Sequence, residues 1–213
     1  MSSSNATGTG SRTELPAPQF ESRDPADAAF WNERFAEGFT PWDFSGVPAD
    51  FIRYANSLTP CPVLIPGCGR AHEARWLAEA GWPVRAIDFA AEAVAAAREQ
   101  LGPHADWVEQ ADFFAYQPPF VPQWVYERTF QCALPLARRA DYARHMAELL
   151  PAGGVLAGFF LIGDTRRGPP FAIERAALDA LLLPNFECVE EHAPADAMAL
   201  FEGRERWMVW RRR

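Results

Sequence analysis

Lysine is missing from this sequence of 213 residues, and all 20 of its lysine-or-arginine positions are arginine. Chemistry that needs a primary amine on a side chain is therefore excluded, including Schiff-base catalysis and the lysine of a phosphate-binding P-loop. Any fixed positive charge in a binding site must come from arginine, which stays protonated at neutral pH and cannot act as a base.

Positive charge is also outnumbered. The 28 acidic side chains give a formal net charge of -8 and an isoelectric point near 5.1, which argues against a nucleic acid as a partner. The sequence has no run of about 18 apolar residues, the length that a membrane-spanning helix needs. We therefore predict neither a nucleic-acid partner nor a membrane partner.

Cysteines are few, and their spacing contains no C-x-x-C pair. They are Cys61, Cys68, Cys132 and Cys188. This usage favours a reduced, cytoplasmic protein, and the first ten residues lack the charged-then-apolar order of a signal peptide. We expect residues 1–24 to form a disordered tail and residues 25–213 to form one domain, with no metal site.

From residue 62 onward, short apolar runs alternate with segments of helical spacing, a pattern typical of a parallel sheet with crossover helices. The predicted strands are residues 62–65, 84–87, 107–108, 124–126 and 155–162, followed by two late strands at 186–191 and 206–210. The predicted helices are residues 26–38, 49–55, 71–80, 90–100, 142–150 and 173–183. The two late strands could form an antiparallel pair at the sheet edge.

Two glycines follow the first of these strands. Gly67 and Gly69 lie between that strand and the next predicted helix, where a tight turn lets a ligand approach the backbone closely. Such turns also occur in many folds without a ligand. The informative partner is Asp88, which ends the second strand about twenty residues on, where nucleotide-binding βαβ units carry the acidic residue for a ribose hydroxyl.

The residues after the glycines favour one class of cofactor. A dinucleotide places its diphosphate at the helix start, but this chain has His72 and Glu73 there. Glu73 suits the positive end of the helix dipole and repels a diphosphate. S-adenosylmethionine carries no phosphate and still presents a ribose to Asp88. The sequence therefore favours S-adenosylmethionine, and a nicotinamide-dependent reductase is the alternative.

Asp112 and Phe113 follow the third predicted strand and support the same cofactor. In such sheets this strand end lies beside the adenine, where a carboxylate can accept a hydrogen bond from the exocyclic amine and an aromatic ring can cover the base. The alternative is that Asp112 is a loop residue and Phe113 belongs to the core.

Several stretches, in one order along the chain, resemble the thiopurine and thiol methyltransferases, a family that includes the plant halide/thiol methyltransferases. They are residues 31–43, Ile65-Pro66-Gly67-Cys68-Gly69 with Asp88, Asp112-Phe113, residues 126–134, Arg139 with Tyr142, and Gly168-Pro169-Pro170-Phe171. The resemblance implies an α/β fold: a single-domain, Rossmann-like class I methyltransferase. Its seven-stranded, mostly parallel sheet would carry helices on both faces and an N-terminal helical cap, here residues 25–57. We expect a monomer.

The resemblance assigns the cap aromatics to the cofactor. Trp31, Phe35 and Trp42 would cover it, and Trp42 would also border the acceptor pocket. Aromatic faces attract a sulfonium by about 0.5–2 kcal/mol, and a closed cap excludes water.

The resemblance also makes Gly67, Asp88 and Arg128 cofactor contacts, and it places Arg139 and Phe171 beside the acceptor. For Arg139, a solvated position at a helix end is the alternative. If the acceptor is anionic and is held by charge, Arg128 or Arg139 would hold it, because the chain has no lysine.

The chemistry implied is methyl transfer from S-adenosylmethionine to a small sulfur nucleophile, such as a thiol or a thiopurine-like compound, or to a halide. Displacement at a sulfonium methyl needs positioning and desolvation more than a general base, and the four scattered histidines offer no dedicated base. The alternatives are an oxygen, nitrogen or metalloid acceptor, and a non-catalytic cofactor-binding protein.

Overall fold

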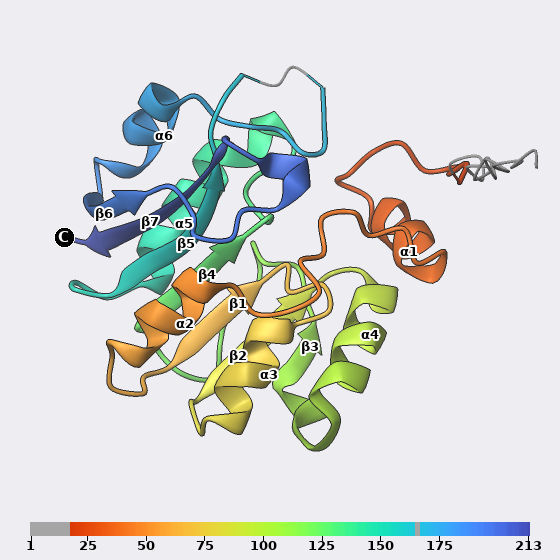
Figure 1. Ribbon diagram of the computed structural model, residues 1–213, viewed down its shortest axis with the longest axis horizontal. Helices are drawn as coiled ribbons and strands as arrows, with labels where there is room; N and C mark the ends of the chain where they lie inside the picture. Colours follow the sequence, from red (N-terminus) through yellow and green to blue (C-terminus); the bar gives the residue numbers. More distant parts are fainter. Residues whose placement is uncertain (1–17, 165–166) are drawn as a thin grey trace, which may run out of the picture.

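The computed structural model describes residues 18–164 and 167–213, which form one seven-stranded sheet with helices on both faces (Figure 1). The strand order is β3-β2-β1-β4-β5-β7-β6, and β7 runs antiparallel to both of its neighbours. The strands are β1 (Val63–Pro66), β2 (Val84–Asp88), β3 (Val108–Gln110), β4 (Trp124–Arg128), β5 (Val155–Leu161), β6 (Phe186–His192) and β7 (Glu205–Arg212). The predicted fold class is therefore confirmed.

The helices largely match the predicted segments. The α-helices are α1 (Ala28–Ala36), α2 (Ala49–Asn56), α3 (His72–Glu79), α4 (Ala91–Leu101), α5 (Arg139–Leu149) and α6 (Arg175–Leu182), and the 3-10 helices are η1 (Gly102–Trp107), η2 (Leu136–Arg138) and η3 (Ala199–Phe201). Trp107 ends η1 and does not begin β3. Gly102, with a φ of 53°, ends α4 there, and the chain makes a 3-10 turn before it can enter the sheet.

Alternate residues of the central strands feed two separate cores. Val63 and Ile65 of β1 pack on the face covered by α2, α3 and α4, whereas Leu64 between them packs on the face covered by α5 and α6. This alternation follows from the two-residue repeat of a strand. Because helices cover both faces, the central strands are apolar on both sides.

The two late strands form the predicted antiparallel pair. β6 lies at the sheet edge, and β7 lies between it and β5. A register shift interrupts the pairing between Cys188 and Glu190. The long loop between these strands, residues 193–204, follows the carboxyl end of β6. It lies at the same end of the sheet as the N-terminal cap, since residues of both line one cavity.

Helix α1 stands apart from the sheet, beside α4 (Figure 1). The segment before it was predicted to be a disordered tail up to residue 24. Residues 1–17 lie outside the described residues, but residues 18–24 pack on α1, because the Glu33 carboxylate accepts the backbone N–H groups of Glu21 and Ser22 at 2.9 and 3.1 Å. The ring of Phe20 also contacts that of Phe39, with centroids 5.5 Å apart.

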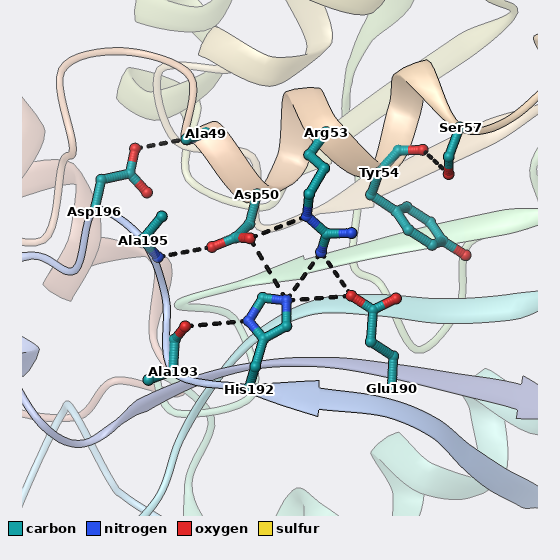
Figure 2. A network of polar contacts seen from close by, with 10 residues as sticks. All are labelled: Ala49, Asp50, Arg53, Tyr54, Ser57, Glu190, His192, Ala193, Ala195 and Asp196. Atoms are coloured by element: carbon teal, nitrogen blue, oxygen red, sulfur yellow. Dashed lines mark hydrogen bonds and ion pairs between the residues drawn. The ribbon is translucent and has the colours of Figure 1, made fainter.

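A polar network joins the first turn of α2 to the end of β6 (Figure 2). Asp50, which is buried, accepts a hydrogen bond from the backbone N–H of Ala195 at 2.9 Å and forms an ion pair with Arg53 at 3.3 Å. Arg53 reaches on to Glu190 at 2.6 Å, and the His192 ring lies 3.2 Å from the same Glu190 oxygen. Helix α2, the second helix of the cap, is thus fixed to the C-terminal strands.

The same network holds the β6–β7 loop in place. The backbone N–H of Ala49 donates to Asp196 at 2.8 Å. Further along this loop, Leu200 and Phe201 of η3 line the cavity described below. The loop and the cap therefore share one polar anchor and one cavity.

None of the helices in the described ranges has both the length and the apolar character needed to cross a bilayer.

Candidate functional site

A cavity of about 840 Å³ opens where the parallel strands end at their carboxyl edge. The strand order reverses here, because β1 continues to β2 on one side and lies against β4 on the other. Ligands of open α/β sheets bind in the crevice at such a reversal. The ends of β1, β2, β3 and β4 form one wall, and α1 with the following segment forms the other.

The turn after β1 depends on Gly67 for a steric reason that the sequence did not reveal. Gly67 has a φ of 59°, and a Cβ added to it would overlap the ring of Phe130. The prediction attributed this glycine to the approach of a ligand. Gly67 does line the cavity, but the close contact is made by the protein itself, since the turn after β4 packs directly on the turn after β1.

Asp88 ends β2 and lines the cavity, as predicted. Its side chain is buried, and its two oxygens accept the backbone N–H groups of Ala90 at 3.0 Å and Gly69 at 3.1 Å. Burial raises the pKa of this carboxyl to about 6, although these N–H groups work in the opposite direction. Asp88 therefore connects the glycine turn to the end of β2 and presents a carboxylate to the cavity near neutral pH.

The residues after β3, Asp112 and Phe113, were predicted either to border the adenine or to be a loop residue and a core residue. Each has features of both. Asp112 is exposed at the cavity wall, and one of its oxygens accepts the backbone N–H of Phe114 at 3.0 Å. Phe113 also borders the cavity but is 4% exposed, and its ring packs against Phe130 and His145. The sequence analysis missed Phe89, which follows Asp88 and lines the cavity half-buried.

The cap brings its three predicted aromatic residues together over the cavity. Trp31, Phe35 and Trp42 all line it. The ring centroids of Trp31 and Trp42 are 5.5 Å apart in an edge-to-face arrangement, and those of Phe35 and Trp42 are 6.2 Å apart. The indole N–H of Trp31 donates to the carbonyl of Pro25 at 2.9 Å, which fixes its orientation.

Asp43, the residue after Trp42, joins the cap to the start of α3. One carboxylate oxygen lies 3.1 Å from Nε2 of His72, and the other lies 3.1 Å from Nε of Arg70. Burial alone would raise the pKa of Asp43, but the hydrogen bonds from His72 and from the backbone N–H of Ser45 lower it overall. The same bond to Asp43 raises the pKa of His72. We call these three side chains, Asp43, His72 and Arg70, the cap latch.

Arg128 lies outside the large cavity, in an adjoining pocket of about 60 Å³. Its guanidinium sits between the rings of Phe44 and Phe159, at 4.6 and 4.5 Å from their centroids. All three guanidinium nitrogens are buried, and none has a hydrogen-bond partner among the described residues. Glu73, which accepts the Tyr126 hydroxyl at 3.0 Å, lines the same pocket. Arg70, Asp43 and His72 of the cap latch line this pocket as well, so Arg128 and Glu73 are the charged side chains in it that do not belong to the latch.

Glu127, next to Arg128, faces away from the cavity and holds the turn after β4. Its fully buried carboxylate accepts the backbone N–H groups of Phe130 and Gln131 at 3.1 and 2.9 Å and the Tyr142 hydroxyl at 2.7 Å. Burial raises the pKa of Glu127 to about 7, against the effect of these donors. Sequence reasoning assigned no role to Glu127, which fixes the position of Phe130 against Gly67.

Arg139 and Phe171, both predicted to border the acceptor, do not line the cavity. The guanidinium of Arg139 donates to the backbone carbonyls of Phe171 and Ala172 at 3.0 and 2.7 Å. This contact holds the segment whose earlier residues, Pro169 and Pro170, do reach the cavity wall. The helix-end arginine is therefore turned toward the backbone of that segment.

The two cysteines near the site are free and stay protonated at neutral pH. Cys132 lines the large cavity and Cys68 lines the small pocket, and burial raises the pKa of both well above its usual range. Neither supplies a thiolate at neutral pH. Within residues 18–164 and 167–213, no group of three or more histidine, cysteine, aspartate or glutamate side chains is arranged to hold a metal ion.

A sequence profile of the family described as thiopurine S-methyltransferase matches residues 26–213. The chain belongs to this family. Thiocyanate methyltransferase 1 of Arabidopsis thaliana is 27% identical over 191 residues, which cover 85% of this chain and 84% of the plant protein. Thiopurine S-methyltransferase of Pseudomonas syringae pv. syringae is 27% identical over 180 residues, covering 74% of this chain and 82% of that protein.

Solved structures agree with the thiopurine S-methyltransferase fold. The 1,6-didemethyltoxoflavin-N1-methyltransferase of Burkholderia thailandensis superposes with a TM-score of 0.68 at 16% identity and covers 93% of both chains. Magnesium protoporphyrin IX methyltransferase of Synechocystis PCC 6803 gives a TM-score of 0.67 at 15% identity, covering 92% of this chain and all of that one. Family membership also confirms the predicted enzyme class and cofactor, since these enzymes are S-adenosylmethionine-dependent methyltransferases.

The cap latch predicts a pH-dependent contribution to stability. Because the folded pKa of His72 is raised, the contribution is complete below the unfolded value of about 6.5 and is lost as pH rises through the folded pKa. We expect His72→Gln to lower the free energy of unfolding by about 1–2 kcal/mol near pH 6 and by progressively less at higher pH. Urea unfolding over this pH range measures it.

The matched control for the latch is the same substitution made in an Asp43→Asn background. There the pH-dependent effect of His72→Gln should be much smaller, because the hydrogen bond and the charge of Asp43 are gone and only the smaller effect of Glu73 still raises the pKa of His72. A difference between wild type and His72→Gln that does not change with pH would contradict the latch.

Proposed function

We propose that this thiopurine S-methyltransferase family member transfers the methyl group of S-adenosylmethionine to a small sulfur nucleophile, a thiol or a thiopurine-like compound, or to a halide. The observation that carries this proposal is the pairing of two adjoining spaces. One presents Asp88 at the end of β2, and the other holds Arg128 without a hydrogen-bond partner. A ligand with a ribose at one end and an amino-acid carboxylate at the other matches both.

The large cavity takes the adenosine part of the cofactor. Asp88 accepts the ribose hydroxyls, because it is an acceptor placed at the end of β2 beside the glycine turn. Asp112 faces the exocyclic amine of the adenine, and Phe89, which follows Asp88 in the chain, lines the same cavity. The edge of Phe113 closes the base of this region, with most of its ring in the core.

The small pocket takes the amino-acid part. Arg128 can donate two parallel hydrogen bonds to the carboxylate, and Glu73 can pair with the ammonium. Gly67, Gly69 and Trp42 border both spaces. The sulfonium, which joins the two halves of the cofactor, therefore lies at this boundary under the cap.

The cap residues serve the transfer by enclosing the sulfonium. Trp31 and Trp42 place aromatic faces and edges there, and such rings attract a cation while excluding water. The acceptor attacks the methyl carbon in line with the departing sulfur, so the methyl moves to the acceptor and the electron pair of the broken bond stays on the cofactor sulfur. An acceptor that is already a thiolate or a halide needs no proton removed.

The charge distribution disfavours the reductase alternative. Glu73 is 8% exposed in the first turn of α3, and its carboxylate faces the pocket that a diphosphate at this helix start would have to enter. Desolvation of a diphosphate and its repulsion by the Glu73 carboxylate both oppose binding at this helix start. We further expect a cytoplasmic monomer that binds no nucleic acid.

The first test concerns Asp88. Asp88→Ala should weaken binding of S-adenosylhomocysteine about 10- to 100-fold, as loss of hydrogen bonds to a charged group implies. In the wild type the dissociation constant should rise as pH falls below about 6, because protonation removes the acceptor. Calorimetry measures both effects. Asp106→Ala, at an exposed position in η1, is the control and should change neither; unchanged binding in Asp88→Ala would refute the assignment.

The second test separates the two halves of the cofactor. Arg128→Met should weaken S-adenosylhomocysteine at least about tenfold and should leave 5′-methylthioadenosine, which lacks the amino-acid carboxylate, within about twofold of wild type. The second ligand also reports that the variant is folded. Equal loss of both ligands would mean that Arg128 acts through the fold and not through the carboxylate.

The third test concerns the acceptor. A panel of thiols, thiopurines, iodide and hydrogen sulfide with labelled methyl donor should give methylated sulfur products or methyl iodide. Turnover confined to oxygen, nitrogen or metalloid acceptors would overturn the sulfur assignment and leave the cofactor site standing. Cofactor binding without turnover of any acceptor would favour a non-catalytic protein.

A further inference from the structure

Arg34 is the buried arginine of the cavity wall, and no carboxylate of the described residues forms an ion pair with it. The charged side chains that line the cavity are three arginines and two aspartates. The arginines are Arg23, Arg34 and Arg138, and the aspartates are Asp88 and Asp112 at the strand ends. Arg138 is ion-paired with Asp141 at 3.5 Å, and Arg23 is exposed. Arg34 is 9% exposed, and none of the described residues places a carboxylate within ion-pair distance of it.

The Arg34 guanidinium packs against two aromatic rings. Its central carbon lies 3.3 Å from the centroid of the Phe30 ring and 4.2 Å from that of Phe20. One nitrogen donates to the carbonyl of Phe30. A guanidinium stacked in this way keeps the remaining N–H groups in its own plane, where they suit an oxyanion. Glu33 is not available to it, because that carboxylate binds the backbone of residues 21 and 22.

The charge of Arg34 is costly in this environment. Burial lowers its pKa; Glu33 opposes this, and the positive charge of Arg23 lowers the pKa further. A buried cation beside a second cation is stabilised when an anion binds between or next to them. The structure thus places at the cavity wall a buried positive charge that no carboxylate of the described residues contacts directly.

The position of Arg34 assigns that charge to the acceptor. Trp31, Arg34 and Phe35 are spaced i, i+3, i+4 on α1, so they share one helix face, and all three line the cavity. The only carboxylate of the cofactor is already accounted for by Arg128 in the other pocket. Neither Arg128 nor Arg139, the residues predicted for an anionic acceptor, borders the large cavity.

We propose that Arg34 is a specificity-determining residue that binds a carboxylate on the acceptor, so that a thiol bearing a carboxylate is preferred over the same thiol without one. Because Phe30, Phe39 and Phe114 line the cavity, an aromatic thiol is a suitable probe of this preference. This inference rests on the proposed methyl transfer to sulfur and adds a residue that selects among acceptors.

Two acceptors that differ by one carboxylate test the proposal, namely thiophenol and 4-mercaptobenzoate, at a pH at which both thiols are ionised. Arg34→Met should lower kcat/KM for 4-mercaptobenzoate at least about tenfold and that for thiophenol less than about threefold. Arg34→Lys should retain part of the preference, since it keeps the charge and loses the planar fork. Arg75→Met, at an exposed residue of α3, should alter neither acceptor.

A binding measurement without turnover distinguishes failure of the proposed methyl transfer from failure of the role of Arg34. With the protein saturated with S-adenosylhomocysteine, 4-(methylthio)benzoate should bind the wild type by calorimetry and should bind Arg34→Met at least about tenfold more weakly. Absence of S-adenosylhomocysteine binding to the wild type would count against the proposed function. Normal binding of it, with both thiols affected equally or not at all by Arg34→Met, would overturn the role of Arg34 alone. Weakened S-adenosylhomocysteine binding in Arg34→Met would place Arg34 at the cofactor and also overturn the inference.

Discussion

The contact between Gly67 and Phe130 is the constraint on which the site is built. These residues belong to the turns after β1 and β4, the neighbouring strands at which the strand order reverses. A Cβ at position 67 would overlap the Phe130 ring, so the two turns can approach only because one of them is glycine at a positive φ. Phe130 is itself wedged against Phe113 and Tyr142. The cavity wall is therefore continuous with the core.

Two buried carboxylates fix these turns by the same device. Asp88 at the end of β2 accepts the backbone N–H of Gly69, and Glu127 in β4 accepts those of Phe130 and Gln131. Burial raises the pKa of both, to about 6 and about 7. Burying an acidic group is unfavourable unless it is hydrogen-bonded, and here the bonds go to turn N–H groups that need acceptors. The turns are consequently rigid before any ligand binds, and only Asp88 faces the cavity.

The arginines in and around the site have different partners and positions. Arg128 occupies the small pocket with Glu73, Arg70 secures the cap through Asp43, and Arg34 carries unpaired charge on the cap wall. Arg139 serves the backbone of residues 171 and 172. In a chain without lysine, one residue type thus performs separate tasks. The partners of each guanidinium, whether carboxylate, carbonyl or aromatic ring, distinguish them.

The amino-acid sequence by itself determined the sheet, its crossover helices, and the glycine turn and aspartate that line the cavity at the strand reversal. These follow from local signals, namely period-two apolar runs, the glycine turn and an aspartate at the next strand end. The resemblance to a known family added the cap aromatics, and the structure places Trp31, Phe35 and Trp42 together. Neither Arg139 nor Phe171, which the resemblance assigned to the acceptor, lines the cavity, whereas Arg34, to which it assigned no role, does.

Only the tertiary structure decided which side chains reach the cavity, and the reason is that these choices depend on contacts between distant segments. Arg139 turns away because carbonyls 32 and 33 residues further along the chain accept its N–H groups. Arg34 lines the cavity and packs against Phe20, which the segment of residues 18–24 brings back onto α1. The position of a strand is encoded in its own residues, whereas the direction of a long charged side chain at a loop or helix end is set by whatever packs beside it.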